Sequence, residues 1–221
     1  METLQNHRTR LAEIVEMAYR IVCQKVAEKS IEIYNEASLQ LHLGTILKSL
    51  GQLYEFSPEE RFVIELEKRI DGIKGTSKTE GAARCDIVLS FYTKGIPSSQ
   101  AFLELKYFKI SDNPHSAEAS KDNRFALFMD LENLEHYRKT TQTEVEDILC
   151  YEIALAQNKT YADPASRSNL KTGHGKMTND SKDATGKVMY ASRKPVSLEG
   201  NYLFDWSTYS ETVHGLIIRM Q

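Results

Sequence analysis

Two apolar segments close together in the chain constrain its fold more than any other feature. RCDIVLSFY (Arg84 to Tyr92) and QAFLELKYFK (Gln100 to Lys109) are separated by a short stretch that contains KGIP. Apolar runs of this length, rich in β-branched and aromatic residues, are typical of strands. Because a short connection can join antiparallel but not parallel neighbours, the sequence predicts an antiparallel hairpin.

Charged residues interrupt both strands of this hairpin at positions that share a face. Successive side chains of a strand point to opposite faces, so Glu104 and Lys106 project together, and Asp86 lies opposite the face of Cys85 and Ile87. Neighbouring strands are only about 4.8 Å apart. The hairpin can therefore present Asp86, Glu104 and Lys106 to one small volume.

The rest of the chain is expected to add helices and strands around the hairpin, which makes an α/β domain. The predicted helices span residues 4–30, 33–50 and 123–139, and the further strands span residues 62–70, 147–157 and 214–221. Gly51 is the expected C′ residue of the second helix, and Trp206 is expected to be a packing anchor.

A third carboxylate lies on the second predicted helix. Glu36 falls in line with Leu39, Leu43 and Leu47, and this apolar stripe must face the protein interior. An unpaired buried charge is costly, so an inward Glu36 needs a compensating partner. A divalent metal ion shared with the hairpin carboxylates is one such partner.

These residues together resemble the signature of the PD-(D/E)XK nuclease superfamily, whose members have a restriction-endonuclease-like fold. In that pattern an Asp begins one strand, Glu-x-Lys lies on the next, and many members carry a Glu on a preceding helix. The matching residues are Asp86 in ARCDIVL, Glu104 and Lys106 in FLELKYF, and Glu36 in NEASLQ. Cys85 stands where the family has Pro, a residue without a chemical role, so this departure weakens recognition more than mechanism.

The resemblance covers about residues 33–137 and implies a fold and an activity. The fold would be a restriction-endonuclease-like core, a mixed central sheet with an antiparallel three-stranded meander flanked by helices, in a single domain spanning residues 1–221. The activity would be endonucleolytic hydrolysis of phosphodiester bonds, in DNA first and RNA second. Mg²⁺, with Mn²⁺ able to substitute, would be held by Asp86, Glu104, the backbone carbonyl of Leu105 and Glu36, the last directly or through water. Lys106 would position and activate the attacking water, so the implied catalytic residues are Glu36, Asp86, Glu104 and Lys106.

Other interpretations of the same residues stay open at this point. Glu104 and Lys106 could form an exposed ion pair of little energetic value, and Asp86 could cap a loop or pair with Arg84. Glu36 could be an acid placed favourably at a helix N-terminus. The alternative for the whole domain is a non-catalytic nucleic-acid-binding or assembly subunit that keeps the nuclease fold, and a third is a subunit of a defence or repair complex. A homodimer would suit the endonuclease, since cutting both strands is commonly achieved by a symmetric dimer.

Charge and composition narrow the partners only partly. The net charge of −3 gives no general attraction to a polyanion. Residues 165–195, however, hold seven Lys or Arg against two Asp, and this basic segment is expected to be a long loop, either a phosphate-binding surface or a solvated linker. The sequence has no long apolar run, so no membrane partner and a cytoplasmic location are expected. The three scattered cysteines are expected to be reduced, and the histidines lack a ligand spacing such as HExxH.

Overall fold

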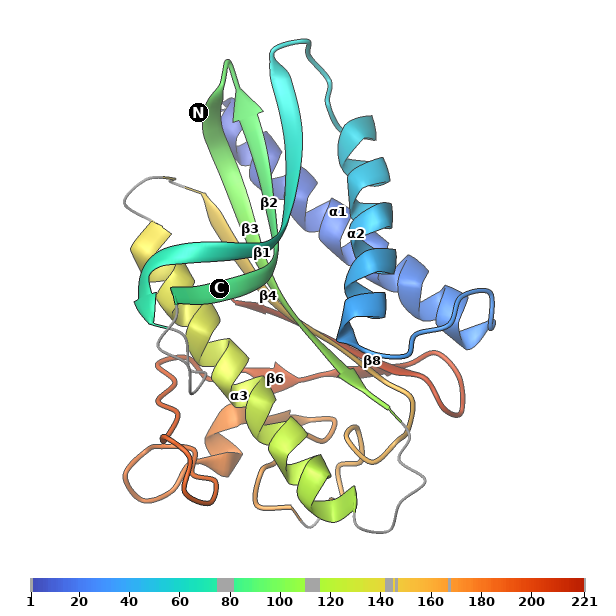
Figure 1. The fold of residues 1–221 in the computed structure, drawn as a ribbon, viewed down its shortest axis with the longest axis vertical. Helices are drawn as coiled ribbons and strands as arrows, with labels where there is room; N and C mark the ends of the chain where they lie inside the picture. Colours follow the sequence, from blue (N-terminus) through green and yellow to red (C-terminus); the bar gives the residue numbers. More distant parts are fainter. Residues whose placement is uncertain are drawn as a thin grey trace.

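The chain forms an α/β structure in which helices cover a six-stranded mixed sheet (Figure 1). The computed structural model describes residues 2–74, 82–109, 116–141, 145, 147–166 and 168–220. The elements are α1 (Glu2–Ala27), α2 (Glu36–Leu53), β1 (Glu60–Lys74), β2 (Ala82–Thr93), β3 (Ile96–Phe108), α3 (Ser116–Thr141), β4 (Ile148–Ala156), β5 (Lys176–Met177), the 3₁₀-helix η1 (Thr178–Ser181), β6 (Leu203–Phe204), β7 (Trp206–Thr208) and β8 (His214–Met220).

The large sheet has the strand order β1-β2-β3-β4-β8-β7. The first three strands form an antiparallel meander, so the predicted hairpin of β2 and β3 is confirmed. Its turn places Lys94 at φ 53° and Gly95 at φ 79°, the left-handed pair that a tight two-residue hairpin turn requires. β4 runs parallel to β3, because the chain returns through the crossover helix α3 before it enters the sheet again.

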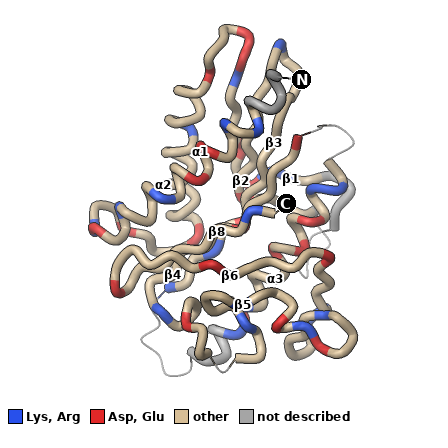
Figure 2. The backbone as a smooth tube through the Cα atoms, turned by 180° about the vertical axis from the view of Figure 1, so that it is seen from behind, with Lys and Arg blue, Asp and Glu red and all other residues tan. Residues whose placement is uncertain are grey.

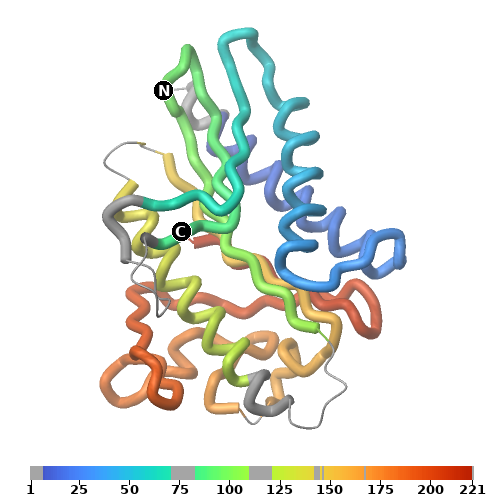
Figure 3. The backbone as a smooth tube through the Cα atoms, viewed as in Figure 1, coloured from blue at the N-terminus to red at the C-terminus, as the bar shows by residue number. Residues whose placement is uncertain are grey.

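Both faces of the sheet are buried, each under a different layer. Leu103, Leu105 and Ile153 pack in one apolar cluster with α1 and α2, whereas Phe102 and Ala154 belong to a second cluster with α3 and the C-terminal part of the chain. Residues adjacent in sequence thus fall into different clusters, as strand alternation requires. Figure 3 shows the same layers as a tube, with the central strands between the N-terminal helices and α3.

The sheet divides where β2 leaves β3. The two strands are paired as far as Ile87 and Leu103, and no pairs between them lie beyond this point in the described residues. β1 and β2 stay paired with each other, and Glu67 of β1, opposite Asp86, has a left-handed φ of 51°. Figure 1 shows β1 turning sharply and running toward α3. Asp86 therefore lies at a fork between the β1–β2 ribbon and β3.

The basic segment 165–195 is folded against the domain and is not a solvated linker, although Arg167 lies outside the described residues. Leu170 and Val188 are buried in the cluster of α3, and Figure 2 shows β5 and β6 beside that helix. The ammonium groups of Lys171 and Lys182 donate to backbone carbonyls within the fold. Only part of the positive charge of the segment is therefore available to a partner.

Three smaller expectations can be compared with the structure. Trp206 is buried and its indole N–H donates to the carbonyl of Thr172, so its packing role is confirmed. Cys23, Cys85 and Cys150 are all buried and free. The prediction that Gly51 follows the second helix is wrong, because α2 continues to Leu53.

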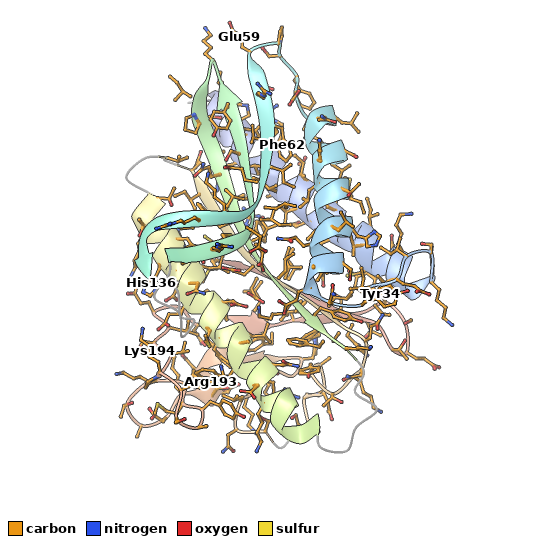
Figure 4. All side chains as sticks on the ribbon, viewed as in Figure 1. Tyr34, Glu59, Phe62, His136, Arg193 and Lys194 are labelled. Atoms are coloured by element: carbon orange, nitrogen blue, oxygen red, sulfur yellow. The ribbon has the colours of Figure 1, made fainter. Side chains whose placement is uncertain are left out.

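Gly51 is needed instead because the ring of Phe62 on β1, labelled in Figure 4, packs against the helix at that point. A Cβ atom added at Gly51 would lie 2.2 Å from two carbons of that ring. At Gly44, two turns earlier, the nearest side-chain atoms would lie 3.6 and 3.8 Å away, an ordinary contact. The two glycines of α2 thus provide a matched pair for measurement.

We expect Gly51→Ala to lower the free energy of unfolding by about 1–3 kcal/mol, because the ring must shift to admit the methyl group. Gly44→Ala should be neutral or stabilising by up to about 1 kcal/mol, since alanine favours the helix. Urea unfolding of both variants measures the difference. Equal effects at the two positions would contradict the packing role of Gly51.

Candidate active site

Asp86 holds the fork of the sheet together with its side chain. Its Oδ2 accepts a hydrogen bond of 2.7 Å from the backbone N–H of Leu105, where the pairing of β2 and β3 has ended. Its own carbonyl accepts a hydrogen bond of 2.7 Å from Nε2 of Gln40 on α2, and the same amide donates to Glu67. Asp86 is therefore no loop cap: its carboxylate substitutes for a missing contact between strands.

Glu104 lies deeper in the site and is held from α3. Its side chain is buried, and its Oε1 accepts a hydrogen bond of 2.9 Å from the hydroxyl of Tyr137. On the neighbouring parallel strand its register partner is Glu152. Glu152 is fully buried, and neither of its carboxylate oxygens has a hydrogen-bond partner among the described residues.

Lys106 extends from β3 to both helical layers. Its Nζ lies 2.8 Å from Oδ2 of Asp130 on α3 and 3.7 Å from Oε1 of Glu36 on α2. It also donates to the carbonyl of Leu105 at 3.2 Å. With Glu104 buried and only 16% of the Lys106 side chain exposed, the interpretation of these two residues as an exposed ion pair is wrong.

Glu36 is near the site but does not face the interior, so that part of the prediction is wrong. The helix begins three residues later than expected, with Asn35 as its N-cap, and Glu36 is its first residue. A residue in the first turn can extend beyond the packed part of the helix, and half of this side chain, 51%, is exposed. Its position fits an acid that interacts favourably with the helix N-terminus and also lies within reach of Lys106.

Burial and mutual repulsion shift the ionisation of the whole cluster. Burial raises the pKa of Asp86 to about 6, although the Leu105 N–H and Lys106 act against this shift. Burial likewise raises the pKa values of Glu104, Glu152 and Asp130. At Lys106, burial acts to lower the pKa, but the charges of Asp130, Glu36 and Glu152 outweigh it and raise the pKa.

The cluster therefore has too little positive charge. The ammonium of Lys106 is surrounded by five carboxylates, those of Asp86, Glu104, Asp130, Glu152 and Glu36. Full ionisation would therefore leave a net charge of −4, five negative charges minus one positive. Such a surplus in a largely buried volume is unfavourable. Protons or a bound cation would offset this surplus.

Three residues of this site, Asp130, Tyr137 and Glu152, were not predicted from the sequence. Glu152 carried a signal, since it is the one charged residue of the otherwise apolar and aromatic strand ILCYEIALA. Asp130 had none beyond its place among apolar residues of α3, and Tyr137 was counted with that apolar stripe. The pairing of β4 with β3 and the packing of α3 bring all three to the site.

The donor set fits a hard divalent cation in chemical type. Asp86 and Glu104 supply carboxylate oxygens, and Leu105, the residue between Glu104 and Lys106, supplies a backbone carbonyl. All of these are oxygen ligands of the kind that Mg²⁺ prefers. Within the described ranges, no three His, Cys, Asp or Glu side chains are arranged as a metal-binding group. The three carboxylates that the resemblance implies, those of Asp86, Glu104 and Glu36, are therefore not gathered into such a group, because half of the Glu36 side chain is exposed at the start of α2.

Comparisons with known proteins identify no relative of this chain. No protein-family model matches the chain, and no curated protein or solved structure is significantly similar to it. None of the helices in the described part of the chain is both long and apolar enough to cross a membrane.

The unpartnered carboxylate of Glu152 leads to a prediction about pH. Its folded-state pKa lies well above the ordinary 4.5, so the unfolded chain releases this proton first as the pH rises. The free energy of unfolding of the metal-free protein should therefore fall as the pH rises above about 4.5, and the loss should persist at higher pH. Glu152→Gln should raise the melting temperature at pH 8 by about 2–8 °C, with a smaller gain at pH 4.

Glu135→Gln on α3 is the matched control for this experiment. The carboxylate of Glu135 accepts hydrogen bonds from the backbone N–H groups of Glu199 and Gly200 and from the hydroxyl of Tyr202. Its replacement should lower the melting temperature, because an amide can accept through one oxygen only. A lower melting temperature for Glu152→Gln at pH 8 would mean that the buried carboxylate is stabilising after all.

Proposed function

We propose that this protein is a Mg²⁺-dependent endonuclease of the PD-(D/E)XK type that hydrolyses phosphodiester bonds, most favourably in DNA. The observation that carries the proposal is the meeting of Asp86, Glu104 and Lys106 around the backbone of Leu105, at the fork between β2 and β3. The element order α2, β1, β2, β3, α3, β4, with an antiparallel meander and a parallel fourth strand, supports it. A restriction-endonuclease-like core is part of the proposal.

Asp86, Glu104 and the carbonyl of Leu105 would hold the metal ion, and Glu36 would reach it directly or through water. When bound, Mg²⁺ supplies charge neutralisation at the phosphoryl oxygens and lowers the pKa of a water molecule, and Mn²⁺ can take its place. The shortage of positive charge in the cluster favours such a cation. The raised pKa values of the carboxylates imply that metal binding is accompanied by proton release.

The residues of the chain itself prepare the site for hydrolysis. Asp86 is oriented by its bond to the Leu105 N–H, and Glu104 by the hydroxyl of Tyr137. The raised pKa of Lys106 keeps this side chain protonated. Its ammonium can hold the attacking water and offset the negative charge that develops as the new P–O bond forms and the bond to the leaving oxygen breaks.

Two further points of the proposal concern partners. RNA is the second candidate substrate, and cleavage of both strands of DNA would suit a homodimer. The alternative function is a nucleic-acid-binding or assembly subunit of a larger defence or repair complex that keeps the fold without cleavage. A cytoplasmic location belongs to the proposal as well.

Plasmid cleavage tests the proposal most directly. We expect cleavage with Mg²⁺ or Mn²⁺ and none in excess chelator. Lys106→Met keeps much of the side-chain volume but removes the ammonium, so it should reduce cleavage by a factor on the order of 10² or more. Lys109→Met is the control, since Lys109 lies exposed just past the end of β3 and should retain the parent rate. Full activity in chelator, or in Lys106→Met, would refute this mechanism.

The basic segment is expected to contribute to binding through its exposed cations. Lys187 and Lys194 are exposed, whereas Lys171 and Lys182 are engaged within the fold. Replacing Lys187 and Lys194 by Gln should weaken DNA binding and reduce the slope of log K against log salt by about 2, since each phosphate contact contributes about 0.9.

Removal of two lysines elsewhere controls for total charge. Lys25 on α1 and Lys48 on α2 are also exposed, and the double Gln variant should keep the parent salt slope. If both double variants bind alike, the basic segment does not contact phosphate.

A further inference from the structure

The ammonium of Lys106 has three neighbouring partners, two carboxylates and one backbone carbonyl, of unequal strength. Asp130 lies 2.8 Å from Nζ, the carbonyl of Leu105 lies 3.2 Å away, and Glu36 lies 3.7 Å away. The side chain of Asp130 is 13% exposed and that of Glu36 is 51% exposed. Because water screens an exposed ion pair, Asp130 is the ion-pair partner that holds Lys106 most firmly, although the angle at its Oδ2 does not make a hydrogen bond.

The carbonyl of Leu105 cannot serve Lys106 and a metal ion equally. If that oxygen binds a divalent cation, the cation withdraws electron density from it and repels the nearby ammonium. Lys106 would then keep two acceptors, Asp130 and Glu36, and only the former is both close and buried. An ammonium without a firm partner would adopt several rotamers, and catalysis depends strongly on a fixed position.

The helix that carries Asp130 is rigidly placed. Leu127, Phe128, Leu131 and Leu134 of α3 are all fully buried in the cluster under the sheet, so the backbone of α3 is held by packing against β3 and β4. Tyr137, two turns after Asp130 on the same helix, holds Glu104. α3 thus contacts both charged residues of the Glu-x-Lys segment.

The geometry points to Asp130 as a positioning residue of this site, which acts by holding the ammonium of Lys106 in place for the attacking water. This inference rests on the proposed nuclease function. Asp130 is not one of the proposed metal ligands, although its charge raises the pKa of Glu104; its ion pair in the site is with Lys106, and its main effect on the reaction passes through that ammonium.

A double-mutant cycle tests whether the two residues act as a unit. The four proteins are the parent, Asp130→Asn, Lys106→Met and the double variant, each measured by thermal unfolding without metal. Asp130→Asn removes the ion-pair partner of Lys106 but also one of the surplus negative charges, so the difference between the two backgrounds carries the test. The change in melting temperature caused by Asp130→Asn should be more favourable in the Lys106→Met background than in the parent, because there it removes a buried charge without a partner. An equal change in both backgrounds would overturn the assigned contact.

Kinetics of plasmid cleavage test the positioning role itself. Asp130→Asn should lower kcat at least tenfold at saturating Mg²⁺ while KM for DNA stays unchanged. Asp130→Glu, which restores the charge, should recover part of the loss. In the Lys106→Met background, Asp130→Asn should cause no further loss.

Asp122→Asn is the control from the same helix, since Asp122 pairs with the exposed Arg193, and it should leave kcat unchanged. A parent that cleaves with Mg²⁺, loses activity in Lys106→Met and keeps its full kcat in Asp130→Asn would overturn the positioning role while the nuclease function stands. A parent without metal-dependent cleavage would overturn the nuclease function and with it the role of Asp130 in the reaction.

Discussion

The hydrogen bond between the carboxylate of Asp86 and the N–H of Leu105 is the contact on which the rest of the site depends. An antiparallel ladder that continued past Ile87 would close the space between β2 and β3, and Asp86 would be one more side chain on a sheet face. The side-chain bond satisfies the backbone of β3 and leaves the strands apart. Gln40 supports the same point from α2. The fork thus opens the sheet without leaving that N–H unsatisfied.

The fork creates a volume in which carboxylates greatly outnumber cations. Burial raises the pKa values of Asp86, Glu104, Asp130 and Glu152, which means that the charged cluster opposes folding in the absence of a cation. Sites that bind charged groups commonly carry this kind of cost, because the arrangement that suits the bound state is unfavourable without it. The two apolar clusters on either side of the sheet compensate for it, since they hold β3 and β4 from both faces.

Features of this chain that depend on interactions between residues close in sequence were predicted correctly, whereas features that depend on packing between distant segments were not. The meander depends on strand alternation and a short connection, both local properties, and the structure has it as predicted. Asp86 does meet Glu104 and Lys106, but at a fork where the ladder of β2 and β3 has ended, which strand alternation did not predict. The prediction that Glu36 faces the interior is wrong, because helical periodicity does not show at which residue the helix begins. Glu36 is the first residue of α2, and its side chain extends beyond the part of the helix that packs on the sheet. The prediction that Gly51 ends the helix is wrong for a related reason. Gly51 is needed because the ring of Phe62 on β1 packs against α2 at that residue, a contact that only the tertiary structure shows.

The sequence by itself therefore determined the α/β class, the hairpin and the shared face of Glu104 and Lys106, because alternation along a strand is set by the covalent chain. Only the tertiary structure decided what surrounds them. Asp130 and Glu152 reach Lys106 and Glu104 because α3 crosses over the sheet and returns the chain as a parallel strand in register with β3. That register is set by the free energy gained when whole faces of helix and sheet are buried. This free energy is the sum of many contacts between residues far apart in the sequence, and no short sequence pattern contains it.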